Sequence, residues 1–315
     1  MENSANKLDP STEGLTQPEP ILTANGTAKE ASCRFNREEG RGGCSLKDAL
    51  SKTDTTILRL SDLISTSSGQ ETVLATVNYS AEILHYALSS SPLQAILVRL
   101  RTRLGLSNPR SPRDGSKSQI PPFLALASLI SETRTAIRLL GLIPLWKWGS
   151  ATMKSPPVDP ILRVVAFAQV FVNVVYQFME NVAFLASKGI ISQRALQRWG
   201  GIGQWYIWAT RAWLSHVVLE FVRLWREQSL FAKQKQLSLE NCPAKGIGEG
   251  QDPAEALRLR AWRKSLVSNL AWFPLCVHWS LEKGAGVPNS MTGLISFIAG
   301  AWKLSDSWEA TARAS

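Results

Sequence analysis

The chain has 315 residues, 44% of them hydrophobic, and its 35 Lys and Arg against 25 Asp and Glu give a formal net charge of +10. This length supplies enough apolar material for one large or two ordinary domains. The positive charge indicates an anionic partner, either a lipid surface or a nucleic acid. Because the sequence has no zinc-finger spacing, RNP-like aromatic strand or basic-zipper heptads, we expect an anionic phospholipid membrane and no nucleic acid.

The sequence lacks the motifs of the common enzyme classes. The phosphate-binding P-loop and the GxGxxG, HExxH and GxSxG patterns are all absent. The three histidines, His85, His216 and His278, lie far apart, and the four cysteines include no CxxC pair. We therefore expect neither a metal site, a cofactor nor a catalytic site.

The N-terminal segment, residues 1–44, is predicted to be a disordered tail. It holds few large apolar side chains and several Pro and Gly residues, so ordering it would cost more conformational entropy than burial returns. Its lack of an apolar signal sequence argues against classical secretion. Helical periodicity begins at residue 45, and residues 45–160 are expected to form a helical region on the cytosolic face of a membrane.

Two helices are expected first, over residues 45–64 and 70–88. In the second helix, the apolar residues recur on one face and the polar residues point away from it. The apolar face contains Val73, Val77, Ala81, Leu84 and Leu88, and the polar residues are Glu71, Asn78 and Glu82. On periodicity alone, a soluble bundle with these apolar faces as its core fits as well as a membrane-bound one.

The stretch Leu93–Leu104 is predicted to be a short amphipathic helix that inserts into the membrane. At 100° per residue its apolar side chains fall within about 100° of arc. Its polar face carries arginines without any acidic residue, a pattern typical of an interfacial helix with snorkelling arginines. The apolar residues are Leu93, Ile96, Leu97, Leu100 and Leu104, and the arginines are Arg99, Arg101 and Arg103.

A second amphipathic helix is expected from about Pro122 to Leu140, after a loop at residues 107–119. Trp residues beside Lys147, just beyond this helix, indicate the headgroup level of a membrane. The residues assigned to the membrane-facing side of the helix are Leu126, Ile130, Arg134, Ile137 and Arg138.

Residues 161–305 are expected to form the membrane-embedded region. Residues 164–179 carry no charge, and together with residues 180–186 they reach a length that can cross a bilayer. Because an acid near the bilayer centre costs about 2.5 kcal/mol, we expect Glu180 and its neighbour Asn181 to face another helix. The segment Ile202–Leu224 is the candidate for that helix, with Arg211 as the candidate ion-pair partner of Glu180.

Two further uncharged stretches, residues 266–281 and 284–302, are expected to form a hairpin with Glu282 and Lys283 at its tip. The second stretch is the best candidate for a span, because 19 helical residues reach about 28 Å, close to the ~30 Å hydrocarbon core. Residues 223–264 are predicted to be a basic flexible loop on the cytosolic side. Two or four spans would place both termini in the cytosol, with residues 306–315 as a short tail.

Three segments carry a resemblance to a known family. They are residues 131–142 with Arg134 and Arg138, residues 176–186 with a Tyr…Glu-Asn…Leu pattern, and residues 269–282 with the block Asn-Leu-Ala-Trp-Phe-Pro-Leu. Their order across about residues 46–305 resembles the peroxin-11 family of peroxisomal membrane proteins, in particular its divergent fungal branch.

The resemblance implies peroxisomal localisation, self-association, and elongation of the membrane before fission through an N-terminal amphipathic helix. Carried onto this chain, that helix is Leu93–Leu104, with the helix of Arg134 and Arg138 as the second choice. We expect an all-α, membrane-associated helical bundle whose partners are other copies of itself, the peroxisomal fission machinery and a membrane-protein import receptor. A pore or transporter for small metabolites and a plain membrane anchor remain open alternatives.

Overall fold

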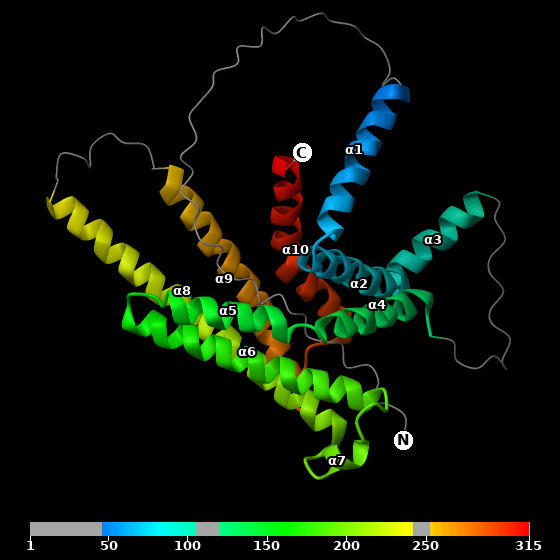
Figure 1. Ribbon diagram of the computed structural model, residues 1–315. Coiled ribbons are helices and arrows are strands. Elements are labelled where there is room, and N and C mark those ends of the chain that lie inside the picture. Colours follow the sequence, from blue (N-terminus) through cyan, green and yellow to red (C-terminus); the bar gives the residue numbers. More distant parts are fainter. Residues whose placement is uncertain (1–45, 105–119, 242–252, 315) are drawn as a thin grey trace, which may run out of the picture.

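The computed structural model describes residues 46–104, 120–241 and 253–314 (Figure 1). In these ranges every regular element is a helix, which confirms the predicted all-α class. The predicted tail and the 107–119 loop lie outside the described residues. The helices are α1 (Leu46–Ile64), α2 (Ser67–Ser89), α3 (Ser91–Arg103), α4 (Pro122–Arg138), α5 (Leu142–Lys154), α6 (Pro160–Ser187), α7 (Gln193–Gln197), α8 (Gly201–Asn241), α9 (Pro253–Trp279) and α10 (Asn289–Ala314).

Side-chain caps fix where two of the central helices begin. Before α2, the Thr66 hydroxyl accepts a hydrogen bond from the Gly69 backbone N–H at 3.0 Å. Before α6, the Asp159 carboxylate accepts from the backbone N–H groups of Ile161 and Leu162 at 3.1 and 3.0 Å. Such caps satisfy backbone donors that have no partner within the helix and contribute about 1 kcal/mol each. The starting residues of α2 and α6 therefore follow from their local sequence.

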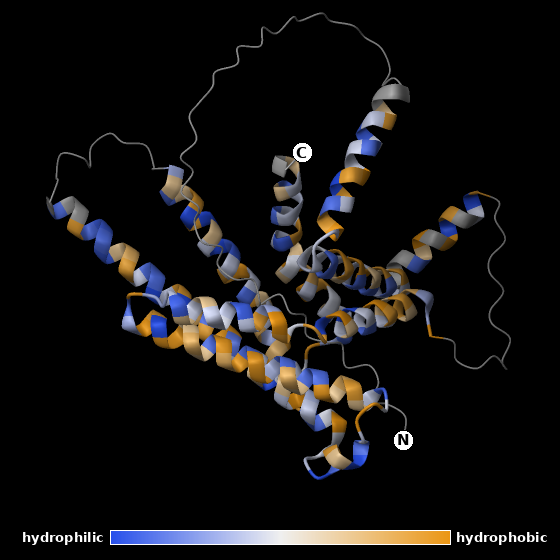
Figure 2. Cartoon of the chain, in the orientation of Figure 1, coloured by the Kyte–Doolittle hydropathy of each residue, from blue (hydrophilic) through white to orange (hydrophobic). Residues whose placement is uncertain are grey.

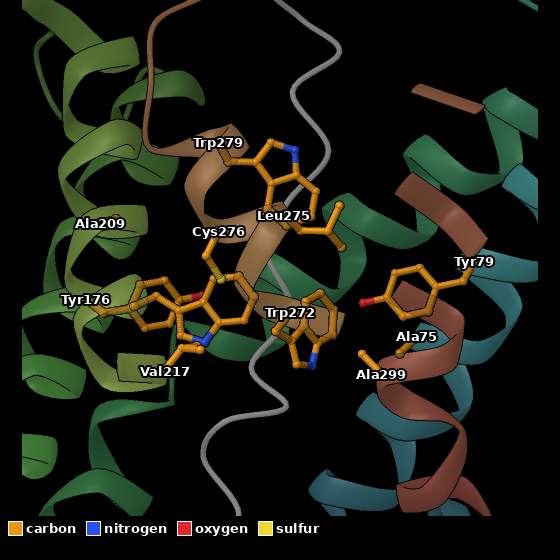
Figure 3. Packing of buried hydrophobic residues seen from close by; sticks show 11 residues of the cluster. Ala75, Tyr79, Tyr176, Ala209, Val217, Trp272, Leu275, Cys276, Trp279 and Ala299 are labelled. Atoms are coloured by element: carbon orange, nitrogen blue, oxygen red, sulfur yellow. The ribbon is translucent and has the colours of Figure 1, made fainter. Parts of the chain in front are cut away.

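The helices form two groups, which α9 joins. In one group α6 packs along α8 and α5, and in the other α2 packs against α4 and α10. Trp272 of α9 lies between the groups, with its ring centroid 6.4 Å from Tyr79 of α2 and 5.1 Å from Trp213 of α8 (Figure 3). All three side chains are buried. Because large aromatic side chains dominate the energetics of a core, this cluster holds the two groups together.

Most of the predicted flexible loop at residues 223–264 is helical. Helix α8 continues to Asn241, and α9 already begins at Pro253. The basic residues of this segment alternate with Leu, Gln, Ala and Glu, which all favour helix, whereas the Pro and Gly residues are concentrated in residues 243–253. The loop prediction was wrong because it extended a short turn signal over good helix-forming sequence.

Among the described helices, only α6 is long and apolar enough to cross a membrane by length and composition. The expected best span, residues 284–302, does not qualify because α10 begins only at Asn289, after Pro288. The 14 residues from there to Trp302 reach about 21 Å, short of the ~30 Å hydrocarbon core. Helix α10 instead packs against α2 and α9. Glu282 and Lys283 lie in the turn between α9 and α10, as predicted.

Candidate membrane-contacting surface and buried charge network

Helix α3 projects from the bundle (Figure 1), and the apolar side chains that the structure describes there beyond Ala95 are exposed. Ile96, Leu100 and Leu104 are 56%, 51% and 64% exposed, and Arg99 and Arg103 are exposed as well. A helix of 13 residues is marginal in water unless an apolar surface covers it. This face is therefore available to lipid. The side chains of Leu93, Leu97 and Arg101 lie outside the described part of the structure.

Helices α5 and α6 are rich in hydrophobic residues (Figure 2), and the exposed ones among them are here called the α5–α6 wall. On α6 the exposed residues follow spacings of three and four, as expected for one face of a helix. Many large apolar side chains exposed on neighbouring helices are typical of a membrane or protein contact. The wall consists of Ile143, Trp146 and Met153 of α5 and Val164, Phe167, Phe171, Val174 and Phe178 of α6.

Behind this wall, α6 and α8 meet through polar side chains, here called the polar seam. Arg226 donates to Asp159 at 2.7 Å, and Gln169 donates to Glu220 at 2.7 Å. One turn further along α6, Asn173 Nδ2 lies 3.0 Å from His216 Nδ1 of α8. The residue numbers fall on α8 as they rise on α6, so the two helices are antiparallel.

Helix α2 shows the same inverted pattern. The side chains of Glu71, Asn78 and Glu82 are buried, whereas Val77 and Leu84 are 41% and 47% exposed. The apolar face of this helix is therefore only partly turned into the core, with Ala81 buried and Val73 half-buried. Polar residues inside and apolar residues outside are typical of helices surrounded by lipid, where charged side chains face the interior of the bundle.

A buried charge network joins α2, α4 and α6. Arg134 donates from Nε and Nη2 to one oxygen of Glu71, at 3.0 and 2.8 Å. One turn later, Arg138 donates from Nε and Nη2 to the two oxygens of Glu180, at 3.0 and 3.1 Å. Arg138 also reaches Glu71 at 3.4 Å, so the four residues form one network. None of the four residues is more than 7% exposed.

Electrostatics keeps the network charged. Burial opposes ionisation of Glu71, but the guanidinium groups of Arg134 and Arg138 hold the pKa of its carboxyl below the usual range. On α6, the Tyr176 hydroxyl donates to Glu180 at 2.9 Å. A buried ion pair is tolerated where additional hydrogen bonds satisfy its charges, and these contacts supply them.

The end of α4 is also held against α6. Gln177 Nε2 donates to the Arg138 carbonyl at 3.0 Å, and Asn181 Nδ2 donates to the Leu139 carbonyl at 3.2 Å. At Gly141 the chain passes so close that a Cβ would lie 2.6 Å from Gln177 Oε1. The backbone beyond α4 is thus fixed by side chains of the Tyr…Glu-Asn segment.

The structure places the predicted site residues differently from the sequence in two respects. On α4, Leu126 is exposed, but Ile130, Arg134 and Arg138 are buried and Ile137 is half-buried, so this helix does not present its arginines to headgroups. Glu180 does face another helix, as expected, but that helix is α4.

The expected pairing of Arg211 with Glu180 is not made. Arg211 Nε instead donates to the Ser280 carbonyl at 3.1 Å, and Glu180 pairs with Arg138. Sequence reasoning also missed Glu71, because an acid on the polar side of an amphipathic helix is normally solvated. The sequence signal that could have found Glu71 is the pair Arg134 and Arg138, because two buried arginines one turn apart need acidic partners.

Comparison with known proteins gave one family and one relative. The family model described as peroxisomal biogenesis factor 11 matches residues 110–308. An uncharacterized protein of Schizosaccharomyces pombe is 28% identical over 175 residues, which cover 55% of this chain and 70% of that protein. No solved structure matches. The family match includes α4 to α9 with both arginines of the charge network, and it begins after α3, later than the residue 46 expected from the resemblance.

Proposed function

The chain belongs to the peroxisomal biogenesis factor 11 family, whose members act in peroxisome biogenesis at the peroxisomal membrane and are not an enzyme family. On this premise we propose that the protein elongates the peroxisomal membrane before fission by inserting α3 into the cytosolic leaflet and by assembling with further copies of itself. The observation that carries the proposal is the inverted pattern of the bundle. Apolar side chains of α2, α3, α5 and α6 face outward, whereas five charged residues of α2, α4 and α6 face inward, namely Glu71, Glu82, Arg134, Arg138 and Glu180.

Helix α3 is proposed as the inserted wedge. Its exposed Ile96, Leu100 and Leu104 would enter the acyl boundary, and Arg99 and Arg103 would hold the helix at anionic headgroups. A helix that occupies area in one leaflet expands that leaflet relative to the other and favours curvature. Because α3 precedes the residues of the family match, its role depends on this exposed face alone.

Helix α6 is proposed as the membrane anchor, with the α5–α6 wall facing lipid or a second copy of the chain. Within the bundle, the polar seam and the charge network keep the polar side chains away from lipid. Helix α8 does not qualify as a span by itself, but if it crosses antiparallel to α6 with its polar side chains in the seam, the hairpin returns the chain to the side from which it entered. Both termini and the basic residues of 223–264 would then lie in the cytosol, within reach of the fission machinery and an import receptor. Protease protection of tagged termini on intact peroxisomes tests this topology.

A pore for small metabolites is the second candidate function. The polar seam favours it, because polar residues between membrane helices can line a pathway for solutes. In a pore the seam would have to open to water, whereas in a remodelling protein it only joins two helices. The two functions therefore differ in whether solutes cross the membrane.

Purified full-length protein on anionic vesicles loaded with a small fluorescent solute distinguishes the candidates. Tubulation without solute release supports membrane remodelling, release without change of shape supports the pore, and neither effect supports a plain anchor. Ile96→Glu with Leu100→Glu is expected to abolish tubulation while the protein stays embedded after carbonate extraction. The matched control is Leu237→Glu with Leu257→Glu, which places the same charges at exposed leucines of α8 and α9. Unchanged tubulation by the α3 variant rejects the wedge.

A further inference from the structure

A groove of about 510 Å³ lies between α9 and α10, and none of the residues that line it belongs to α3 or to the charge network. Its apolar lining includes Leu259 and Val267 of α9 and Trp302 of α10. Volumes of several hundred Å³ are typical of sites that hold one small molecule. Three cations, Arg260, Arg263 and Lys264, also line it, so the groove combines an apolar lining with positive charge.

The positive charge of the groove is only partly neutralised. Lys264 forms an ion pair with Asp306 and lies 5.7 Å from the centre of the Trp302 ring. Arg260 and Arg263 are exposed, and in the part of the chain that the structure describes neither makes a hydrogen bond or an ion pair. Two guanidinium groups one turn apart thus remain available at the edge of an apolar surface.

We propose that this groove binds a single anionic phospholipid. The headgroup phosphate would lie at Arg260 and Arg263, because guanidinium groups match phosphate geometry with two parallel hydrogen bonds. The acyl chain would lie along Val267 and Trp302, and tryptophan is suited to the level where headgroup and chain meet.

The spacing on α9 supports this arrangement. Arg260, Arg263, Lys264 and Val267 lie at positions i, i+3, i+4 and i+7, so all four share one face of the helix. A free phosphate would use the arginines but leave the apolar lining uncovered, which is why a lipid is the better match. The site goes beyond the proposed function, since it recognises one lipid molecule rather than inserting into a leaflet.

The test uses the full-length chain in a neutral detergent and a lysophosphatidic acid with a brominated acyl chain, which quenches nearby tryptophan fluorescence. Wild-type protein is expected to bind this lipid more tightly than lysophosphatidylcholine with the same chain. Arg260→Gln with Arg263→Gln is expected to weaken binding about 30-fold, from about 1 kcal/mol for each cation at an anionic lipid surface. The matched control is Arg194→Gln with Arg198→Gln, which removes two exposed arginines at α7 and is expected to bind as wild type.

Trp302→Phe is expected to lower the quenching amplitude, because it removes the fluorophore nearest to the acyl chain. The proposal is overturned if the neutral lipid binds equally well, if the α7 control loses as much affinity, or if inorganic phosphate displaces the lipid completely. Loss of binding in the wedge variant Ile96→Glu with Leu100→Glu would assign the lipid to α3 instead. A smaller oligomer of the groove variant with unchanged lipid binding would assign the groove to a second copy of the chain.

Discussion

Breaking the contact between Arg138 and Glu180 tests whether the charge network holds α4 against α6. Arg138→Met removes two guanidinium hydrogen bonds, of 3.0 and 3.1 Å, from the Glu180 carboxylate and leaves that charge buried. Removal of one partner from a buried ion pair costs about 3–5 kcal/mol in the free energy of unfolding. Glu180→Met is expected to cost a similar amount. The double variant replaces both charges by apolar side chains, so it should be more stable than the sum of the single losses predicts by about 2–3 kcal/mol.

The assay is denaturant unfolding of the purified chain in detergent micelles, followed by tryptophan fluorescence and circular dichroism. Arg211→Met combined with Glu180→Met provides the control cycle, because Arg211 donates to the Ser280 carbonyl and not to Glu180. Its coupling energy is expected to lie within about 0.5 kcal/mol of zero. The contact between Arg138 and Glu180 is refuted if their cycle shows no coupling energy, or if the cycle of Arg211 and Glu180 shows an equal coupling energy.

Two further predictions concern the interior. Burial raises the pKa of Glu82 from 4.5 to about 7, although Arg134 opposes the shift. Between pH 4.5 and about 7, Glu82 is therefore protonated in the native state and ionised in the unfolded state. Stability should therefore fall as the pH rises from about 5 to 7 and then level off, and Glu82→Gln should match wild type at pH 5 but exceed it at pH 8 by up to about 3 kcal/mol. Thermal unfolding across pH checks this, with the exposed Asp54→Asn as control, and parallel curves for Glu82→Gln and wild type would contradict it. Gly141→Ala, whose methyl group would meet Gln177, should destabilise by about 1–3 kcal/mol. In the same assay Gly203→Ala, which meets nothing within 4 Å, should be neutral or stabilising, so equal effects of the two alanines would disprove the close packing.

The sequence predicted the helices better than it predicted their surroundings. Periodicity gave the position of α3 to within two residues, and Pro122 marked the start of α4. The same periodicity could not decide which face of α2 turns inward. An amphipathic pattern is the same whether its apolar face packs in a protein core or faces lipid. Glu71 and Glu82 were placed on the side away from the apolar face, and the structure buries both.

The partners in the charge network depend on the tertiary arrangement of the helices. The segments with Arg134, Arg138 and Glu180 both carry the family resemblance, but their spacing along the chain does not say which charge meets which. Glu180 lies 42 residues from Arg138 and 31 from Arg211, and only the packing of α4 on α6 selects the first. The nine-residue connection between α9 and α10 shows the converse, since a local charged pair was enough to predict a turn.

The polar seam has a mechanical consequence. Its paired side chains recur along α6 and α8, so a slip of one helix by a single turn, about 5.4 Å, would separate all the partners at once. Each buried polar group left without its partner costs about 1–3 kcal/mol, and these costs would accumulate along the seam. The hairpin therefore resists sliding of one helix along the other and behaves as a rigid unit. If α3 inserts into one leaflet as proposed, the resulting lateral pressure would move the α6–α8 hairpin as a unit instead of sliding its two helices past each other.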